Sequence, residues 1–218
     1  MTNPIWLRRQ HVAPFVADDM VAVAVSHMDH WHAGLLYADS KGVAHLLHLA
    51  FHHRLINDQD FDTYAFVVPP LDPEARANVS AMCERIWRRN RTRGLPYGFR
   101  FDATRFDGSG EMRLGSDEVG LTCATLPLAV FASVGRPLVD MRTWEGRADD
   151  REAQAALLEL LRRHCRDAGD HLATVANQVG CVRVRPQEAA GACSTERLPC
   201  VFSVACAAGE AIRVALGG

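Results

Sequence analysis

Short apolar runs of strand length fill the first third of the chain. They cover residues 18–28, 32–38, 42–51 and 63–70, and the second and third flank the turn-forming sequence DSKG. Apolar runs of this length bounded by turn residues are typical of β-strands. The pattern therefore predicts an antiparallel sheet that is built before residue 70, with residues 32–38 and 42–51 as a hairpin.

After this sheet, apolar residues recur at helical spacing. Asp72 is suited to cap a helix that begins at Pro73 and continues to about residue 90. Residues 93–120 are rich in Gly and Asp and predict loops and short strands, whereas residues 121–135 return to helical periodicity and stop at Gly135. The apolar face of the first helix consists of Ala75, Val79, Met82 and Ile86.

The final third of the chain is predicted to be mostly helical. The expected helices cover residues 150–169, 170–180, 185–193 and a last segment after Pro199. The whole pattern predicts an α+β fold, in which a small antiparallel sheet is wrapped by helices. We expect one domain over residues 1–218, with a core at 18–135 and a helical C-terminal extension at 150–218.

Composition and charge exclude several classes of protein. A net charge of −2 provides no strong field for binding nucleic acid, and no apolar run is long enough to span a membrane. The first residues lack the apolar segment of a signal peptide. The seven cysteines are an odd set with no C-x-x-C pair, which favours reduced thiols over a disulfide framework or a zinc ribbon. We therefore expect a cytoplasmic protein.

One cysteine stands out as a candidate nucleophile. Cys123, in the sequence GLTCAT, follows a Gly-rich loop and precedes an apolar helix, with Thr122 in position to cap that helix. Free N–H groups at a helix N-terminus favour a thiolate and can stabilise an oxyanion. Pro127 would interrupt the helix unless it begins a residue or two later. The alternative for Cys123 is a small buried residue on a core helix.

A cysteine nucleophile requires a histidine base, and seven of the ten histidines lie between residues 27 and 53. His32 opens the predicted strand 32–38, and Gly34 leaves room beside it on the same face. We therefore predict that His32 is the base. His30 lies on the same face, so it is the alternative base, whereas Trp31 between them is expected to pack on the opposite face.

The base in turn needs an orienting group from the partner strand. If the loop at DSKG has an even number of residues, Leu36 faces His45, which places His45 on the His32 face. An odd loop would bring His48 to that face instead. The four residues of DSKG favour the even loop, so His45 is the predicted third member of the site.

Two other interpretations use the same residues. Histidines at alternate positions of one strand, with another from the hairpin, could form a zinc site with Asp29, Asp117 or Glu118. The protein could also be a non-catalytic binding module in which cysteine and histidine are structural. The cysteine interpretation implies no metal and no cofactor.

The stretches DDMVAVAV and HAGLLYADSKGVAHLLHLA resemble the circularly permuted NlpC/P60 group of papain-like cysteine hydrolases, which includes the lecithin:retinol acyltransferase-like enzymes. In that pattern a histidine opens a strand, a second histidine follows a hairpin, and the cysteine comes much later at a helix start. His32, His45 (or His48) and Cys123 match these positions. The resemblance covers residues 18–53 and 115–135.

The sequence also departs from this group. Asp18 stands where the group has glycine, and Tyr37 is displaced by one position. The resemblance implies a papain-like core and a thiol-dependent hydrolase or acyltransferase. Its substrate would be a peptide, a protein or a small acyl compound with an amide, ester or thioester bond.

Overall fold

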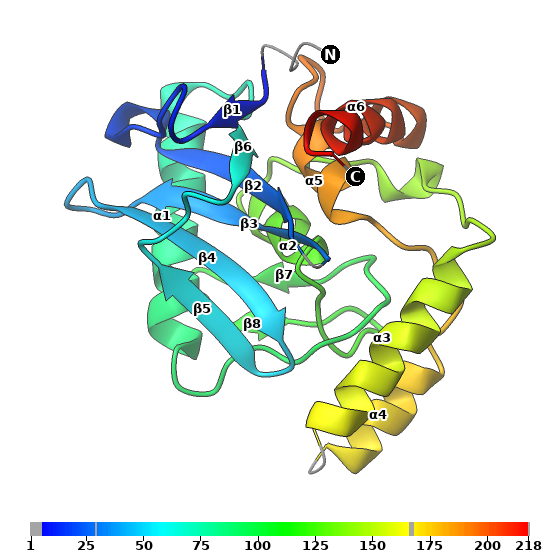
Figure 1. Ribbon diagram of the computed structural model, residues 1–218. Helices are drawn as coiled ribbons and strands as arrows, with labels where there is room; N and C mark the ends of the chain where they lie inside the picture. Colours follow the sequence, from blue (N-terminus) through cyan, green and yellow to red (C-terminus); the bar gives the residue numbers. More distant parts are fainter. Residues whose placement is uncertain (1–5, 29, 166–167, 218) are drawn as a thin grey trace.

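The computed structural model describes residues 6–28, 30–165 and 168–217 and shows an α+β fold (Figure 1). Its main sheet has six strands in the order β1-β6-β2-β3-β4-β5, and every neighbouring pair is antiparallel. The predicted strands are confirmed as β2, β3, β4 and β6, whereas β1 and β5 were not predicted. The strands are β1 Arg8–Arg9, β2 Val21–His27, β3 Trp31–Ala38, β4 Ala44–Phe51, β5 Arg54–Asp58 and β6 Ala65–Val67.

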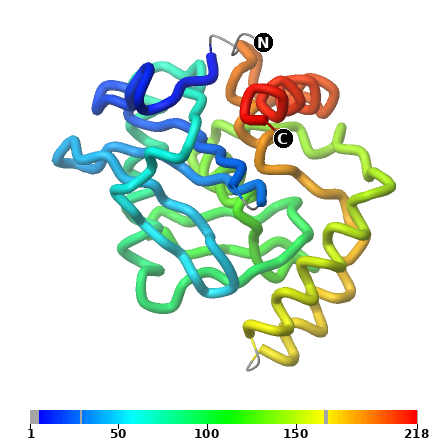
Figure 2. Tube along the Cα trace, in the orientation of Figure 1, coloured from blue at the N-terminus to red at the C-terminus, as the bar shows by residue number. Residues whose placement is uncertain are grey.

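Helices follow the sheet in sequence, and α1, α2 and α5 pack against one of its faces, while α3 and α4 extend away from it, as the path of the chain in Figure 2 shows. The predicted helices are confirmed, and residues 93–120 form loops with a two-stranded sheet, as expected. The α-helices are α1 Pro73–Asn90, α2 Thr125–Ser133, α3 Asp150–His164, α4 Gly169–Ala176, α5 Pro186–Ala192 and α6 Phe202–Ala215. The shorter elements are β7 Arg105–Phe106, β8 Met112–Arg113 and the 3-10 turns η1 Ala17–Asp19 and η2 Met141–Thr143.

Helix α1 begins where its sequence indicates. The Asp72 carboxylate accepts a hydrogen bond from the Ala75 N–H at 2.7 Å, and Pro73 occupies the first helical position, where no N–H is needed. The four apolar residues at helical spacing are all buried. The helix therefore packs its predicted face against the sheet.

The two faces of the main sheet bury different cores. Odd-numbered residues of β2 and β3, such as Val23 and Leu35, join side chains of α1, α2 and α5 in the larger core. Even-numbered residues, such as Ala24 and Leu36, form a smaller core that is closed by the rings of Phe15, Phe61 and Phe66. Alternation along each strand therefore decides which of the two environments a side chain enters.

The β3–β4 hairpin differs from the expected one by one residue. Ala38 pairs with Ala44, and Tyr37 rather than Leu36 faces His45, so the loop comprises residues 39–43. The Asp39 side chain accepts hydrogen bonds from the N–H groups of Lys41 and Val43, each at 2.9 Å. Such bonding by an aspartate to its own turn makes Val43 a loop residue. The predicted even loop was therefore wrong.

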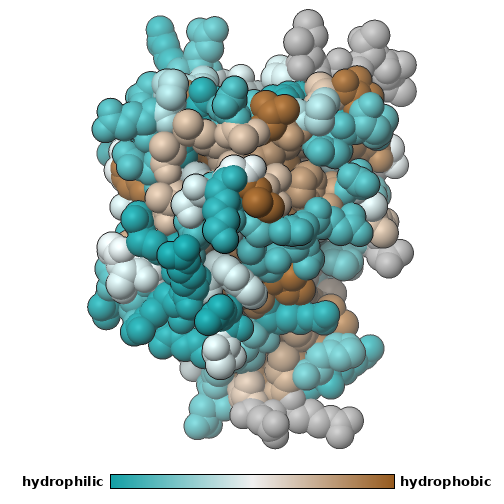
Figure 3. All heavy atoms as spheres, turned by 90° about the vertical axis from the view of Figure 1, so that its left-hand side faces the viewer, coloured by the Kyte–Doolittle hydropathy of each residue, from teal (hydrophilic) through white to brown (hydrophobic). Residues whose placement is uncertain are grey.

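The C-terminal helices are joined to the rest of the chain by polar contacts. The half-buried Arg147 guanidinium forms ion pairs with the buried carboxylates of Glu188 in α5 and Asp150 in α3. Arg9 of β1 donates to the carbonyl oxygen of Ala215 in α6 at 2.9 Å, so the two ends of the described chain meet. On the surface in Figure 3, hydrophobic and hydrophilic side chains are interspersed. Among the described residues, no helix is long and apolar enough to cross a membrane.

Candidate functional site

His32 and His48 form a hydrogen-bonded pair on the face of the smaller core. His32 is the second residue of β3, and its Nε2 lies 2.8 Å from Nδ1 of the buried His48 in β4. Gly34, two residues after His32 on β3, lies beside His48. A Cβ atom added to Gly34 would lie 2.8 Å from the Cβ of His48, so a side chain there would displace the second histidine. The absence of a side chain at Gly34 allows the two rings to meet.

A carboxylate extends this pair. Nε2 of His48 lies 3.4 Å from Oδ2 of Asp58 at the end of β5. A carboxylate only accepts hydrogen bonds, so Nε2 of His48 carries the hydrogen and its Nδ1 is the acceptor. His32 must then donate through Nε2–H, which leaves Nδ1 of His32 with a lone pair. No described residue forms a hydrogen bond to that Nδ1, so His32 is in the tautomer that a base requires.

His45 does not join this pair, because the shifted register places it on the opposite face. There it stacks on Tyr37 at 5.4 Å between ring centroids and contacts Asp39 at 3.2 Å and Asn57 at 3.3 Å. The expectation that His45 shares a face with His32 was wrong. The odd loop gives that position to His48, the alternative that the sequence left open.

The segment that carries Cys123 forms a turn just before α2. The helix begins at Thr125, and the hydroxyl oxygens of Thr122 and Thr125 each accept the main-chain N–H of the other residue, at 3.2 and 2.8 Å. The N-cap position is occupied by Ala124, so the expectation that Thr122 is the N-cap residue was wrong. Pro127 falls in the first turn of α2, where its missing N–H costs nothing.

Cys123 is partly exposed and lies beside Ala33 of β3. Burial raises the pKa of its thiol, while a hydrogen bond from the Ala33 amide and the charge of Arg183 oppose that rise. Nearby Tyr64 has its pKa raised chiefly by burial and further by Cys123. The Tyr64 ring is also 6.4 Å from that of His32 between centroids.

The first residues of β3, including His32 and Ala33, are not paired with β4. Pairing between β2 and β3 extends to His27 and Trp31, whereas pairing between β3 and β4 stops at Leu35 and Leu47. The Ala33 amide that contacts the thiol lies in the part of β3 beyond this last pair. Among the described residues, no hydrogen bond joins the Cys123 sulfur to His32. Cys123 therefore contacts the main chain of β3 one residue after His32, and the described contacts include no direct bond between the two side chains.

Burial keeps both histidines neutral at physiological pH. Burial and the neighbouring rings of His48 and His30 lower the pKa of His32 to about 3. Burial also lowers the pKa of His48, although its hydrogen bond to Asp58 opposes this effect. Because the thiol pKa is raised, the resting pair is a neutral thiol and a neutral imidazole rather than a thiolate–imidazolium ion pair.

Comparison with protein-family models, with curated proteins and with solved structures gave no match. The site is therefore interpreted from its own geometry and chemistry.

The sequence did not indicate the carboxylate of this site. Asp58 lies on β5, which begins directly after the tight turn at His53, a non-glycine residue with φ +54°. The run RLIND between two polar stretches is the available signal for this strand. Tyr64 and Ser26, which are hydrogen-bonded to each other, were also not singled out.

His30, the alternative base, is exposed and precedes β3, and its ring centroid is 6.2 Å from that of His32. Trp31 packs against the larger core, as predicted for its face. Among the described residues, no group of three or more His, Cys, Asp or Glu side chains could hold a metal ion. The Glu118 carboxylate instead accepts hydrogen bonds from three main-chain N–H groups at residues 102–104, and Asp29 lies outside the described residues.

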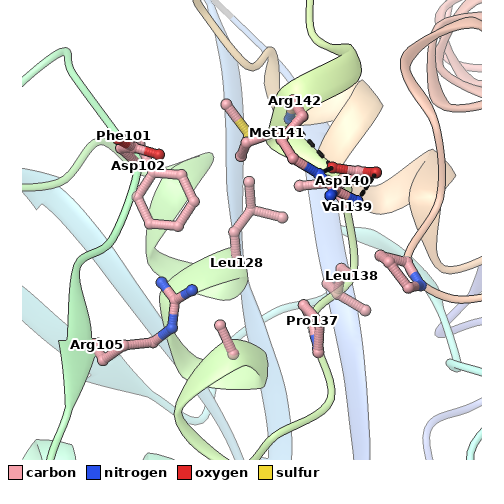
Figure 4. A pocket seen from close by; sticks show the side chains of 12 residues that line it. Phe101, Asp102, Arg105, Leu128, Pro137, Leu138, Val139, Asp140, Met141 and Arg142 are labelled. Carbon is pink, nitrogen blue, oxygen red and sulfur yellow. Dashed lines mark hydrogen bonds and ion pairs between the residues drawn. The ribbon is translucent and has the colours of Figure 1, made fainter.

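A cavity of about 280 Å³ lies apart from these residues, between α2 and the segment of residues 137–142. Leu128 and Met141 contribute to its walls, and Arg105 points into it (Figure 4). Its lining includes neither Cys123 nor the paired histidines.

Proposed function

We propose that the protein is a thiol-dependent hydrolase or acyltransferase that acts on an amide, ester or thioester bond. The observation that carries this proposal is the chain Asp58–His48–His32, which fixes the tautomer of His32 beside the strand amide that contacts Cys123. A base with an orienting partner and a nearby nucleophile is the arrangement that acyl transfer requires. The permuted papain-like core remains part of this proposal.

In the proposed reaction, the sulfur of Cys123 attacks the carbonyl carbon while Nδ1 of His32 takes the thiol proton. The carbonyl π electrons move to oxygen, and the amides of Cys123 and Ala124, which also favour the thiolate, serve as donors to this oxyanion. When the tetrahedral intermediate collapses, His32 returns the proton to the leaving group. Water or another acceptor then attacks the acyl-cysteine, with His32 again as base.

The neutral resting pair determines how this reaction begins. The thiol must lose its proton during the attack, because burial opposes a thiolate formed in advance. His32 can accept a proton wherever it is neutral, and its pKa is lowered to about 3. Acylation should therefore continue in mildly acidic buffer and be lost as the pH falls towards about 3.

The test uses p-nitrophenyl acetate as an acylating probe, with mass spectrometry to locate the acetyl group. We expect acetylation of Cys123 with release of p-nitrophenolate, and its loss in Cys123→Ala and His32→Ala. Cys206, a partly exposed thiol in α6, provides an internal reference in every sample. Acetylation of Cys123 that is no faster than that of Cys206, or that is unchanged in His32→Ala, would refute the proposal.

A non-catalytic binding module is the second candidate, and two observations favour it. Among the contacts of the described residues, no hydrogen bond joins Cys123 to His32, and the raised thiol pKa opposes a reactive thiolate. Alkylation by iodoacetamide separates the two candidates when acetylation is measured alongside it. Both predict slow alkylation of Cys123 near pH 7, but only the enzyme predicts acetylation that depends on His32.

A further inference from the structure

Two histidines from distant parts of the chain hold the main chain of Tyr97 from both sides. Nδ1 of His52, in the turn after β4, accepts a hydrogen bond from the Tyr97 N–H at 3.1 Å. Nε2 of His171, in α4, lies 2.7 Å from the Tyr97 carbonyl oxygen. Nε2 of His171 must carry a hydrogen, because a carbonyl only accepts, whereas Nδ1 of His52 must not carry one.

The two rings also face each other. The ring centroids of His52 and His171 are 4.4 Å apart, and those of His52 and His53 are 4.2 Å apart. The segment from Gly94 to Gly98 packs on the same side, and its one titratable side chain is that of Tyr97. The groups that affect protonation of His52 are therefore the two neighbouring imidazoles, and a positive charge on either disfavours one on His52.

The Tyr97 segment is joined directly to the segment that leads to Cys123. Tyr97 forms a parallel bridge with Leu121, and the Gly98 N–H donates to the Leu121 carbonyl oxygen at 3.2 Å. Gly98 and Gly120 lie back to back, since a Cβ atom on Gly98 would be 2.8 Å from the Gly120 nitrogen. Two main chains in such close contact cannot shift independently. A displacement at Tyr97 is thus passed to the turn that holds Cys123.

The side chain of Tyr97 strengthens this link. It is buried against Phe51 and Phe99, with ring centroids 6.3 Å away in each case. Burial raises the pKa of Tyr97, and the nearby Cys123 raises it further. Tyr97 is therefore linked to Cys123 in two ways. Its main chain pairs with Leu121, and its phenol group interacts electrostatically with the Cys123 thiol.

We propose that His52 and His171 are positioning residues that hold Tyr97, and through Leu121 the turn at Cys123, in a pH-dependent clamp. Protonation of Nδ1 would replace the acceptor of His52 by a donor that faces the Tyr97 N–H. The clamp then loses one of its two bonds, and the turn at Cys123 is freed. The importance of this position for catalysis rests on the proposed function, whereas the clamp itself does not.

The direction of the pH dependence follows from burial. Burial, His53 and His171 lower the pKa of His52 from 6.5 to about 4. A lowered histidine pKa stabilises the folded arrangement above 6.5, and this stabilisation is lost as the pH falls from 6.5 towards 4. The clamp should therefore be closed at neutral pH and open in acid.

Hydrogen exchange of the Tyr97 amide tests the clamp without any substrate. In the wild type, protection relative to the intrinsic exchange rate should fall as the pH is lowered towards about 4. His52→Asn keeps an acceptor at the position of Nδ1 but does not titrate, so its protection should not depend on pH. His52→Phe should lack protection at every pH. His53→Asn is the matched control, because asparagine tolerates the positive φ at that position, and it should retain the acid-induced loss.

A second readout follows Cys123 itself. 4,4′-Dithiodipyridine reacts with thiols in acid as well as at neutral pH, and mass spectrometry assigns the reacting cysteine. We expect the reactivity of Cys123 to change in acid in the wild type but not in His52→Asn, with circular dichroism showing that both remain folded. The clamp is refuted if His52→Asn loses Tyr97 protection at the same pH as the wild type, or if His52→Phe is protected like the wild type. Failure of the acetylation test alone would remove the proposed function and leave the clamp standing.

Discussion

Replacement of His48 by alanine should slow acetylation of Cys123, because it removes the acceptor that orients His32. The lost contact is the 2.8 Å hydrogen bond between Nε2 of His32 and Nδ1 of His48. A buried donor left without its partner costs about 1–3 kcal/mol. If this cost falls on the transition state, the rate should fall by about 5- to 150-fold, since ~1.4 kcal/mol changes a rate tenfold.

The assay compares three variants by their p-nitrophenolate burst and by the acetylation of Cys123. His48→Ala removes the acceptor, whereas His48→Asn provides an amide oxygen where Nδ1 stood and should retain more of the rate. His45→Ala is the matched control, since His45 lies three positions before His48 in the same strand, points to the opposite face and contacts Asp39 instead. Thermal unfolding of each variant shows whether loss of rate accompanies loss of the fold.

Two results would contradict this reasoning. The orienting role of His48 is excluded if His48→Ala and His45→Ala acetylate equally fast while both remain folded. The hydrogen-bond explanation is excluded if His48→Asn is as slow as His48→Ala, because the two differ chiefly in the acceptor. A fall in rate in His45→Ala alone would restore the site first expected from the sequence.

Two further substitutions test the frame around the site. Gly34→Ala would place a Cβ atom 2.8 Å from the Cβ of His48 and 3.0 Å from the Leu47 carbonyl oxygen, so we expect a loss of about 1–3 kcal/mol in stability and slower acetylation. A thermal midpoint and rate equal to the wild type would show that the hairpin absorbs the methyl group. Asp72→Ala removes the cap on the Ala75 N–H and should lower the free energy of unfolding by about 1 kcal/mol in urea titrations, with acetylation unchanged. An unchanged urea midpoint would contradict the capping role.

Elements whose signals are local were predictable from the sequence. Helix α1 is specified by residues within a few positions of each other, from the Asp72 cap to the buried Ile86, and it formed as expected. The strands around His32 were also evident, because alternation and turn residues act over the same short range. Strand β5 was missed because the turn before it uses a histidine with positive φ, where glycine or asparagine is the usual signal.

The site depended on information of a different kind. Whether His45 or His48 meets His32 is decided by one residue of loop length, because a shift of one position moves every side chain to the other face. The residue that decides it is Asp39, whose side chain binds the N–H groups of Lys41 and Val43 and so extends the loop. The four residues of DSKG favoured the shorter loop, whereas the structure has the longer one, in which Asp39 accepts these two hydrogen bonds.

The same residue links the fold to the chemistry. By assigning Val43 to the loop, the Asp39 turn directs His48 towards His32 and sends His45 to the opposite face, where Asp39 itself binds it. A catalytic role for His32 therefore requires no special feature in β3 beyond Gly34, since the hairpin register supplies the partner and β5 supplies Asp58. The proposed reaction further requires the Cys123 thiol to approach Nδ1 of His32 when the substrate binds. Acetylation that depends on His48 would show that this approach occurs, because an orienting residue can affect the rate only through a base that is engaged in the reaction.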